Sequence, residues 1–141
     1  MNEQEARQRL AEARVATLAT ADASGRPHLV PICFVVDRDR LYSAVDHKPK
    51  RRPDLRRLAN LRANPSASVL VDHYDEDWGR LWWVRADGTA TVLDPEDDQT
   101  GEERGRAVAL LVDKYEQYVG RAPGGAVISL ALRSWQSWAP P

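Results

Sequence analysis

The chain has 141 residues and a formal net charge of −1, with 43% hydrophobic and 29% charged residues. This length suits one domain over residues 1–141 with its own core, and the balanced charge argues against a nucleic-acid-binding protein. The longest apolar run, Leu29 to Val36, is too short to span a membrane, and the charged N-terminus lacks a signal-peptide core. A single cysteine, Cys33, excludes an intramolecular disulfide. We therefore expect a cytoplasmic protein.

The residue pattern predicts a mainly β protein with flanking helices. The expected helices are Glu3 to Ala13, Pro53 to Ala63 and Glu102 to Val119. The expected strands are Val15 to Thr20, Leu29 to Val36, Leu41 to Val45, Ser66 to His73, Leu81 to Leu93 and Ala126 to Trp138. Hairpin-length connections in the first half favour antiparallel pairing, so we expect an antiparallel six-stranded barrel with helices packed outside.

The second expected strand contains two residues of interest. Pro31 cannot donate a ladder hydrogen bond, so it marks a sheet edge, a bulge or a gap that faces a ligand. Cys33 lies within an apolar run, and we expect it to be an inert core residue and not a nucleophile.

The stretch from His47 to Arg62 concentrates positive charge. It holds seven of the 20 lysines and arginines and one acid, Asp54. It begins where a strand ends and enters a helix N-terminus, where unpaired backbone N–H groups favour an anion. On charge alone a solvated helical face is an equal alternative, and a nucleic-acid surface is disfavoured because no aromatic residue interrupts the stretch. We expect a phosphate site.

The phosphate candidates are two mobile lysines ahead of the helix and two arginines within it. They are Lys48, Lys50, Arg56 and Arg57. The apolar stripe of this helix is expected at Leu55, Leu58 and Ala59, which leaves both arginines off the buried face.

Catalytic motifs are absent from the sequence, including the nucleophile elbow, the HExxH zinc motif and the phosphate-binding loop. His28, His47 and His73 show no metal-ligand spacing, so no metal site is expected. A phosphate site without an acid, base or nucleophile suggests that a cofactor carries the reaction.

Five tryptophans fall near the last two predicted strands, at positions 78, 82, 83, 135 and 138. Trp82 and Trp83 point to opposite faces of one strand. We expect at least one of them in the core, and the other to cover a subunit interface or a flat aromatic ligand.

Three segments together resemble a known family. The segment VATLATADASGRPHLVPICFVVDRDRLYSAVDHKPK resembles the opening of the pyridoxamine 5'-phosphate oxidase-like split β-barrel proteins. The segments LRRLANLRANPSASVLVDHYDEDW and LWWVRADGTATV are similar to an actinobacterial branch of that family, the coenzyme F420-dependent oxidoreductases. The pattern TLAT, turn, GRPH, VP and then DxKPK is specific in combination.

The resemblance implies a homodimer of split barrels with two cofactor sites at the subunit interface. The phosphate would lie against the four basic candidates named above. The cofactor ring would lie near Val30, Pro31, Ile32, Ser43, Ala44 and Val45. An aromatic residue of the partner subunit, Trp78 or a C-terminal tryptophan, would close the site.

The resemblance favours an F420-dependent oxidoreductase that transfers a hydride between the deazaflavin ring and a small organic substrate. F420 carries a phosphate and an oligoglutamate tail, so we expect one subset of the basic stretch to meet the phosphate and another to meet the tail. The alternatives are an FMN-dependent oxidoreductase on the same fold, and a non-enzymatic protein that binds F420, FMN or haem. Neither nucleic acid nor a membrane is an expected partner.

Overall fold

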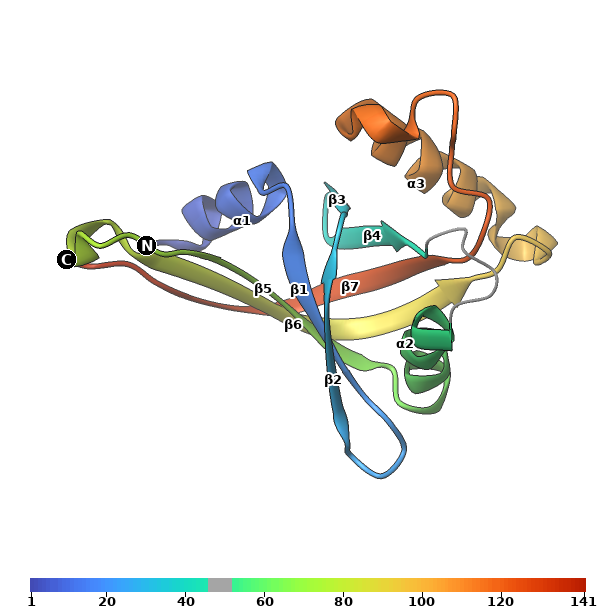
Figure 1. Ribbon diagram of the computed structural model, residues 1–141, viewed down its shortest axis with the longest axis horizontal. Coiled ribbons are helices and arrows are strands. Elements are labelled where there is room, and N and C mark those ends of the chain that lie inside the picture. Colours follow the sequence, from blue (N-terminus) through green and yellow to red (C-terminus); the bar gives the residue numbers. More distant parts are fainter. Residues whose placement is uncertain (46–51) are drawn as a thin grey trace.

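In the part of the chain that the structure describes, seven antiparallel strands and three α-helices make up the fold (Figure 1). The computed structural model describes the backbone of residues 1–45 and 52–141, and the side chains of residues 1–45 and 56–141. The helices are α1 (Glu3–Glu12), α2 (Arg52–Ala63) and α3 (Gly101–Lys114). The strands are β1 (Ala16–Ala21), β2 (Pro27–Ile32), β3 (Val35–Asp37), β4 (Arg40–Ala44), β5 (Ser66–His73), β6 (Trp82–Leu93) and β7 (Val127–Trp138).

The prediction of six strands is wrong, because the expected strand from Leu29 to Val36 is two strands. β2 pairs with β1 and β3 pairs with β4, so both leave the same stretch of chain for different neighbours. Cys33 and Phe34 lie between them and belong to neither strand. A continuous apolar run gives no sign of such a change of partner, since both halves are equally suited to strands.

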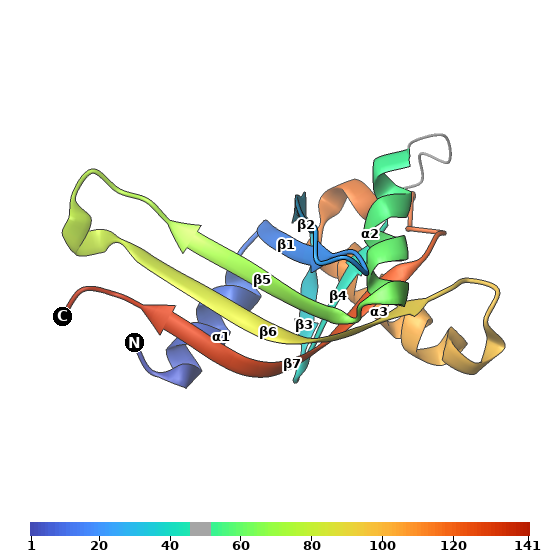
Figure 2. The same ribbon diagram turned by 90° about the horizontal axis from the view of Figure 1, so that it is seen from below.

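The joint at Cys33 and Phe34 links the two edges of the sheet. The strand order is β2-β1-β5-β6-β7-β4-β3, which places β2 and β3 at opposite ends. The three residue steps from Ile32 to Val35 span about 11 Å at most. The two edges must therefore lie close together, and the sheet curls into an open barrel, as Figures 1 and 2 show.

The main core lies on the inner face of the curled sheet. Side chains such as Leu18, Val69, Val84 and Leu130 are almost fully buried there. Helix α1 packs against β6 and β7 and adds Leu10 to this core. A β-bulge between β6 and β7 is placed at Gly88, where a Cβ atom would clash with the carbonyl oxygen of Ala131.

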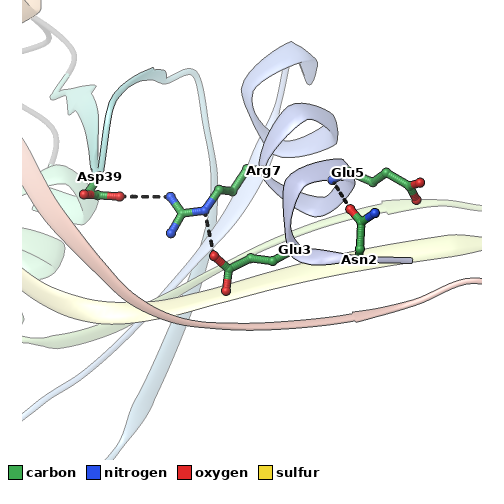
Figure 3. Close-up of polar contacts among 5 residues, drawn as sticks. All are labelled: Asn2, Glu3, Glu5, Arg7 and Asp39. Carbon is green, nitrogen blue, oxygen red and sulfur yellow. Dashed lines mark hydrogen bonds and ion pairs between the residues drawn. The ribbon is translucent and has the colours of Figure 1, made fainter.

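Polar contacts fix helix α1 at the edge of the barrel (Figure 3). The Asn2 side chain caps the helix by accepting from the backbone N–H of Glu5 at 2.8 Å. The Arg7 guanidinium bonds Glu3 at 3.1 Å and Asp39 of the β3–β4 turn at 2.9 Å. It also lies 4.7 Å from the ring centroid of Trp135. These contacts join the N-terminus to the edge strands.

Helix α3 covers part of the outer face. A second, smaller core forms where Ala107 meets Tyr42, Leu93 and Val127. The helix ends at Lys114, earlier than the predicted end at Val119, because Tyr115 is extended and a short 3₁₀ turn, Glu116–Tyr118, follows.

Helix α2 is rotated relative to the predicted stripe. Leu58 is buried as expected, but Ala59 is exposed and Arg57 is 7% exposed, so the prediction that Arg57 lies off the buried face is wrong. The amide of Asn60 donates to the hydroxyl of Thr20 at 3.1 Å, in a buried contact with β1. This polar anchor turns Arg57 inward, which an apolar stripe alone does not predict.

Candidate functional site

A cleft of about 890 Å³ opens beside the β2–β3 joint. Its walls come from the end of β2, the end of β4, helix α2 and the segment that follows α3. Six of the residues predicted for the cofactor site line it together. They are Pro31, Ile32, Ser43, Ala44, Val45 and Arg57.

Hydrogen bonds fix the end of β4 against the joint. The hydroxyl of Ser43, which is 1% exposed, donates to the carbonyl oxygen of Cys33 at 2.8 Å. The backbone N–H of Val45 donates to the carbonyl oxygen of Ala126 at 2.9 Å. The apolar wall of the cleft is therefore held by polar contacts with both neighbouring segments.

The hydroxyl of Tyr115 holds the joint itself. It accepts from the backbone N–H of Phe34 at 3.0 Å, and it shares its proton between the carbonyl oxygens of Phe34 at 3.0 Å and Arg14 at 2.9 Å. Phe34 is fully buried and leaves the sheet ladder here, so its backbone groups need this partner. Burial raises the pKa of Tyr115, which keeps the hydroxyl protonated as a donor.

Cations gather next to this tyrosine. Lys114 donates to the carbonyl oxygens of Ala13 at 2.8 Å and Ala11 at 3.3 Å, and its ammonium group lies 4.1 Å from the Phe34 ring centroid. Burial and, to a smaller extent, the neighbouring Arg14 lower the pKa of Lys114 to about 8. This corner of the cleft therefore has a positive potential.

Cys33 is exposed and lines the cleft, so the prediction that it lies in the core is wrong. The alternation of β2 continues through the joint, so Cys33 shares the exposed face of Pro31, whereas Phe34 is buried in the core. Its position makes it a natural reporter of whatever binds there.

Three predicted site residues that the structure describes do not line the cleft, and two others lie outside the described residues. Val30 faces the core from β2, and Arg56 is exposed and lies nearer Asp22 of the β1–β2 turn. Trp78 is 68% exposed and lies in the short turn between β5 and β6, at the projecting end of that hairpin (Figure 2). Lys48 and Lys50 lie outside the described residues.

Sequence reasoning missed three lining residues that carry charge or hydrogen bonds, namely Arg14, Tyr115 and Arg121. Tyr115 falls within the helix predicted from Glu102 to Val119, and Arg121 lies just beyond its predicted end. The signal available in the sequence is a pair of tyrosines at the end of a helix, followed closely by an arginine and then Pro and Gly residues.

A second, smaller cleft of about 540 Å³ lies between the β3–β4 turn and α3. Its polar groups pair with one another: Tyr42 donates to Glu103 at 2.8 Å, and Arg106 lies 3.6 Å from Asp37. Arg40 donates to the Ser129 hydroxyl at 3.1 Å. These contacts hold α3 to the sheet, so we regard this cleft as structural.

Two further properties concern the described residues only. Within them, no three His, Cys, Asp or Glu side chains gather as potential metal ligands. No helix in the described ranges has the length and apolar character that a bilayer crossing requires.

A curled antiparallel sheet whose edges meet at a short joint, with flanking helices, is an open, split-barrel fold. The chain belongs to the pyridoxamine 5'-phosphate oxidase family, whose pattern matches residues 3–139. No protein with a curated description matches the chain.

Solved structures show the same fold at low sequence identity. The conserved protein Rv2991 of Mycobacterium tuberculosis has a TM-score of 0.75 and 22% identity, over 99% of this chain and 85% of that one. A FAD-binding protein of Mesorhizobium loti has a TM-score of 0.71 and 23% identity, over 97% and 94%. HutZ, a heme storage protein of Vibrio cholerae, has a TM-score of 0.71 and 17% identity, over 97% and 93%.

Removal of the Tyr115 hydroxyl tests its role at the joint. We expect Tyr115→Phe to lower the free energy of unfolding by about 1–3 kcal/mol, because the buried Phe34 N–H loses its partner. Amide exchange at Phe34 should accelerate under native conditions. Tyr42→Phe is the matched control, since Tyr42 is also a buried tyrosine and its hydroxyl bonds Glu103 instead. Faster exchange at Phe34 in both variants, or in neither, would contradict the role.

Proposed function

We propose that this protein is a coenzyme F420-dependent oxidoreductase that transfers a hydride between the deazaflavin ring and a small organic substrate. The observation that carries the proposal is the meeting of six predicted ring and phosphate residues in one cleft. They come from three separate segments, β2, the β4 end and α2, which only the folded chain brings together.

The donor set suits a planar cofactor with an anionic group. Pro31, Ile32, Ala44 and Val45 offer a largely apolar wall for a ring system, and Arg57 offers a fixed guanidinium for a phosphate. When bound, the deazaflavin supplies the hydride chemistry. The chain's own residues orient the ring and exclude water, and the lysines Lys48 and Lys50 would add phosphate contacts.

We also propose that the protein is a homodimer with the cleft at the subunit interface. In the described structure no helix covers the outer face of β2, β1 and β5, and Val15, Leu29 and Leu70 are exposed there. Trp82 packs toward the core, as predicted for one of the pair, whereas Trp83 lies on the outer face opposite Trp138. A second copy on this face would bury these side chains.

The same face runs up to the cleft. Leu70 is paired with Thr17, which is paired with Pro31 on the edge strand. Pro31 lines the cleft, so a second copy seated on the face would border the cleft as well. The exposed Trp78 on the projecting β5–β6 hairpin is the candidate aromatic residue that closes the partner's cleft.

FMN is the second candidate cofactor on this fold, favoured by the similar fold of the FAD-binding protein of Mesorhizobium loti. A non-enzymatic carrier of F420, FMN or haem is the third, favoured by the similar fold of the heme storage protein HutZ. Turnover of a model acceptor with reduced F420 separates an enzyme from a carrier.

The cofactor assignment is tested by binding with Cys33 as reporter, since it is the only cysteine and lines the cleft. We expect F420 to quench tryptophan fluorescence, to bind more tightly than FMN and to slow modification of Cys33 by a thiol reagent. Arg57→Gln should weaken F420 binding by about tenfold and reduce its dependence on salt, since a charge-assisted hydrogen bond is lost. Arg56→Gln is the matched control and should change affinity by less than about twofold, because Arg56 lies outside the cleft.

Two results would overturn the assignment. Tighter binding of FMN than of F420 would replace the deazaflavin with the flavin. Unchanged Cys33 reactivity at saturating ligand would place the binding site outside this cleft.

The dimer is tested by placing a charge on the uncovered face. We expect sedimentation to show a dimer for the natural chain and a monomer for Leu70→Glu, because a buried carboxylate would face apolar surface. Ala109→Glu is the control, since Ala109 is an exposed apolar residue of α3 that does not line the cleft and should leave the dimer intact. A monomeric natural chain, or equal mass for both variants, would contradict the proposed interface.

A further inference from the structure

Positive charge reaches the cleft from more than one side. Arg57 comes from α2, whose Leu58 and Leu61 pack into the main core on the inner face of the sheet. Arg14 comes from the α1–β1 connection, and Arg121 from the loop that follows α3, the helix on the outer face. Arg14 and Arg121 therefore approach the cleft from segments other than the predicted basic stretch.

Neutral groups hold Arg14 in place. Its Nη2 donates to the carbonyl oxygen of Lys114 at 2.9 Å, and its guanidinium lies 4.8 Å from the ring centroid of Tyr115. Its backbone carbonyl accepts from the Tyr115 hydroxyl at 2.9 Å. Among the described residues, neither Arg14 nor Arg121 forms an ion pair with a carboxylate. Arg14 is thus a fixed cation without a counter-charge.

The surroundings of Arg14 add to this positive charge. Arg14 bonds the backbone of Lys114 and lowers the pKa of its ammonium group, so a second cation lies near Arg14 although it does not line the cleft. Neighbouring cations that have no carboxylate partner attract the anionic group of a bound ligand.

We propose that Arg14 and Arg121 form a second anion subsite, separate from the phosphate subsite at Arg57, for a second anionic group of the same ligand. The chemistry is that of a carboxylate or phosphate oxygen received by guanidinium groups. A glutamyl tail of F420 or the second phosphate of FAD would supply it. This inference rests on the proposed function, since it needs a ring cofactor in the cleft.

The subsite replaces an expectation drawn from the sequence alone, which placed both the phosphate and the tail on the stretch from His47 to Arg62. Of the described side chains in that stretch, Arg57 alone lines the cleft. The subsite at Arg14 and Arg121 gives the tail its own contacts at the end of the cleft beside Tyr115.

The experiment compares ligand pairs that share a ring and differ in the second anion. Dissociation constants are measured by tryptophan fluorescence for F420 and its tail-free form, and for FAD and FMN. We expect Arg14→Gln and Arg121→Gln each to weaken binding of F420 roughly tenfold and to leave the tail-free form within about twofold. A parallel loss for FAD and not FMN would identify a diphosphate as the second anion instead.

Arg133→Gln is the control, because Arg133 is an exposed arginine of β7 outside the cleft and its loss changes the net charge equally. It should leave all four affinities unchanged. Arg121 is exposed, so its variant tests the subsite without disturbing the packing around Arg14 and Tyr115.

The results separate the subsite from the wider proposal. The second subsite would be overturned if the Arg14 and Arg121 variants weakened binding of both members of each ligand pair equally, or if neither variant weakened binding. The cofactor assignment would stand in both cases. Failure of the natural chain to bind any of the four ligands would overturn both.

Discussion

The two-residue joint at Cys33 and Phe34 is the constraint on which the rest of the structure depends. It carries the chain from one edge of a seven-stranded sheet to the other, so the sheet must curl until its edges approach. The joint cannot use the sheet's own hydrogen bonds, and the buried backbone of Phe34 would be left unpaired. The hydroxyl of Tyr115 satisfies it from a segment 81 positions away in the chain.

The cleft is a direct result of this joint. β2 and β4 diverge where the chain crosses, and the segment after α3 supplies the tyrosine that keeps the opening in shape. Because Tyr115 also bonds the carbonyl of Arg14 and lies against its guanidinium, the same side chain that fixes the fold fixes a cation at the cleft. Tyr115 therefore determines both the shape of the joint and the position of the Arg14 charge. The guanidinium that Tyr115 holds and the apolar wall of the cleft are the features on which the proposed cofactor binding rests.

Much of the local structure could be predicted from the sequence, because local residue patterns determine local structure. Ser66–His73 was predicted to the residue, and the walls of the cleft at Pro31, Ser43 and Val45 followed from the family resemblance. The features that could not be predicted depend on contacts between residues that are far apart in the sequence. The division of one apolar run into β2 and β3 is decided by their partners, and the rotation of α2 by the bond from Asn60 to Thr20. Tyr115 could not be distinguished from a core residue, because its hydroxyl partners are far away in the chain.

We propose that a phosphate-bearing ring cofactor binds in the cleft beside the β2–β3 joint. A crystal structure of the protein grown with F420 tests this proposal most directly. We predict the ring against Pro31, Ala44 and Val45, with its phosphate at the guanidinium of Arg57. A ligand bound between the β3–β4 turn and Arg106, or a cleft that stays empty at saturating F420, would contradict it.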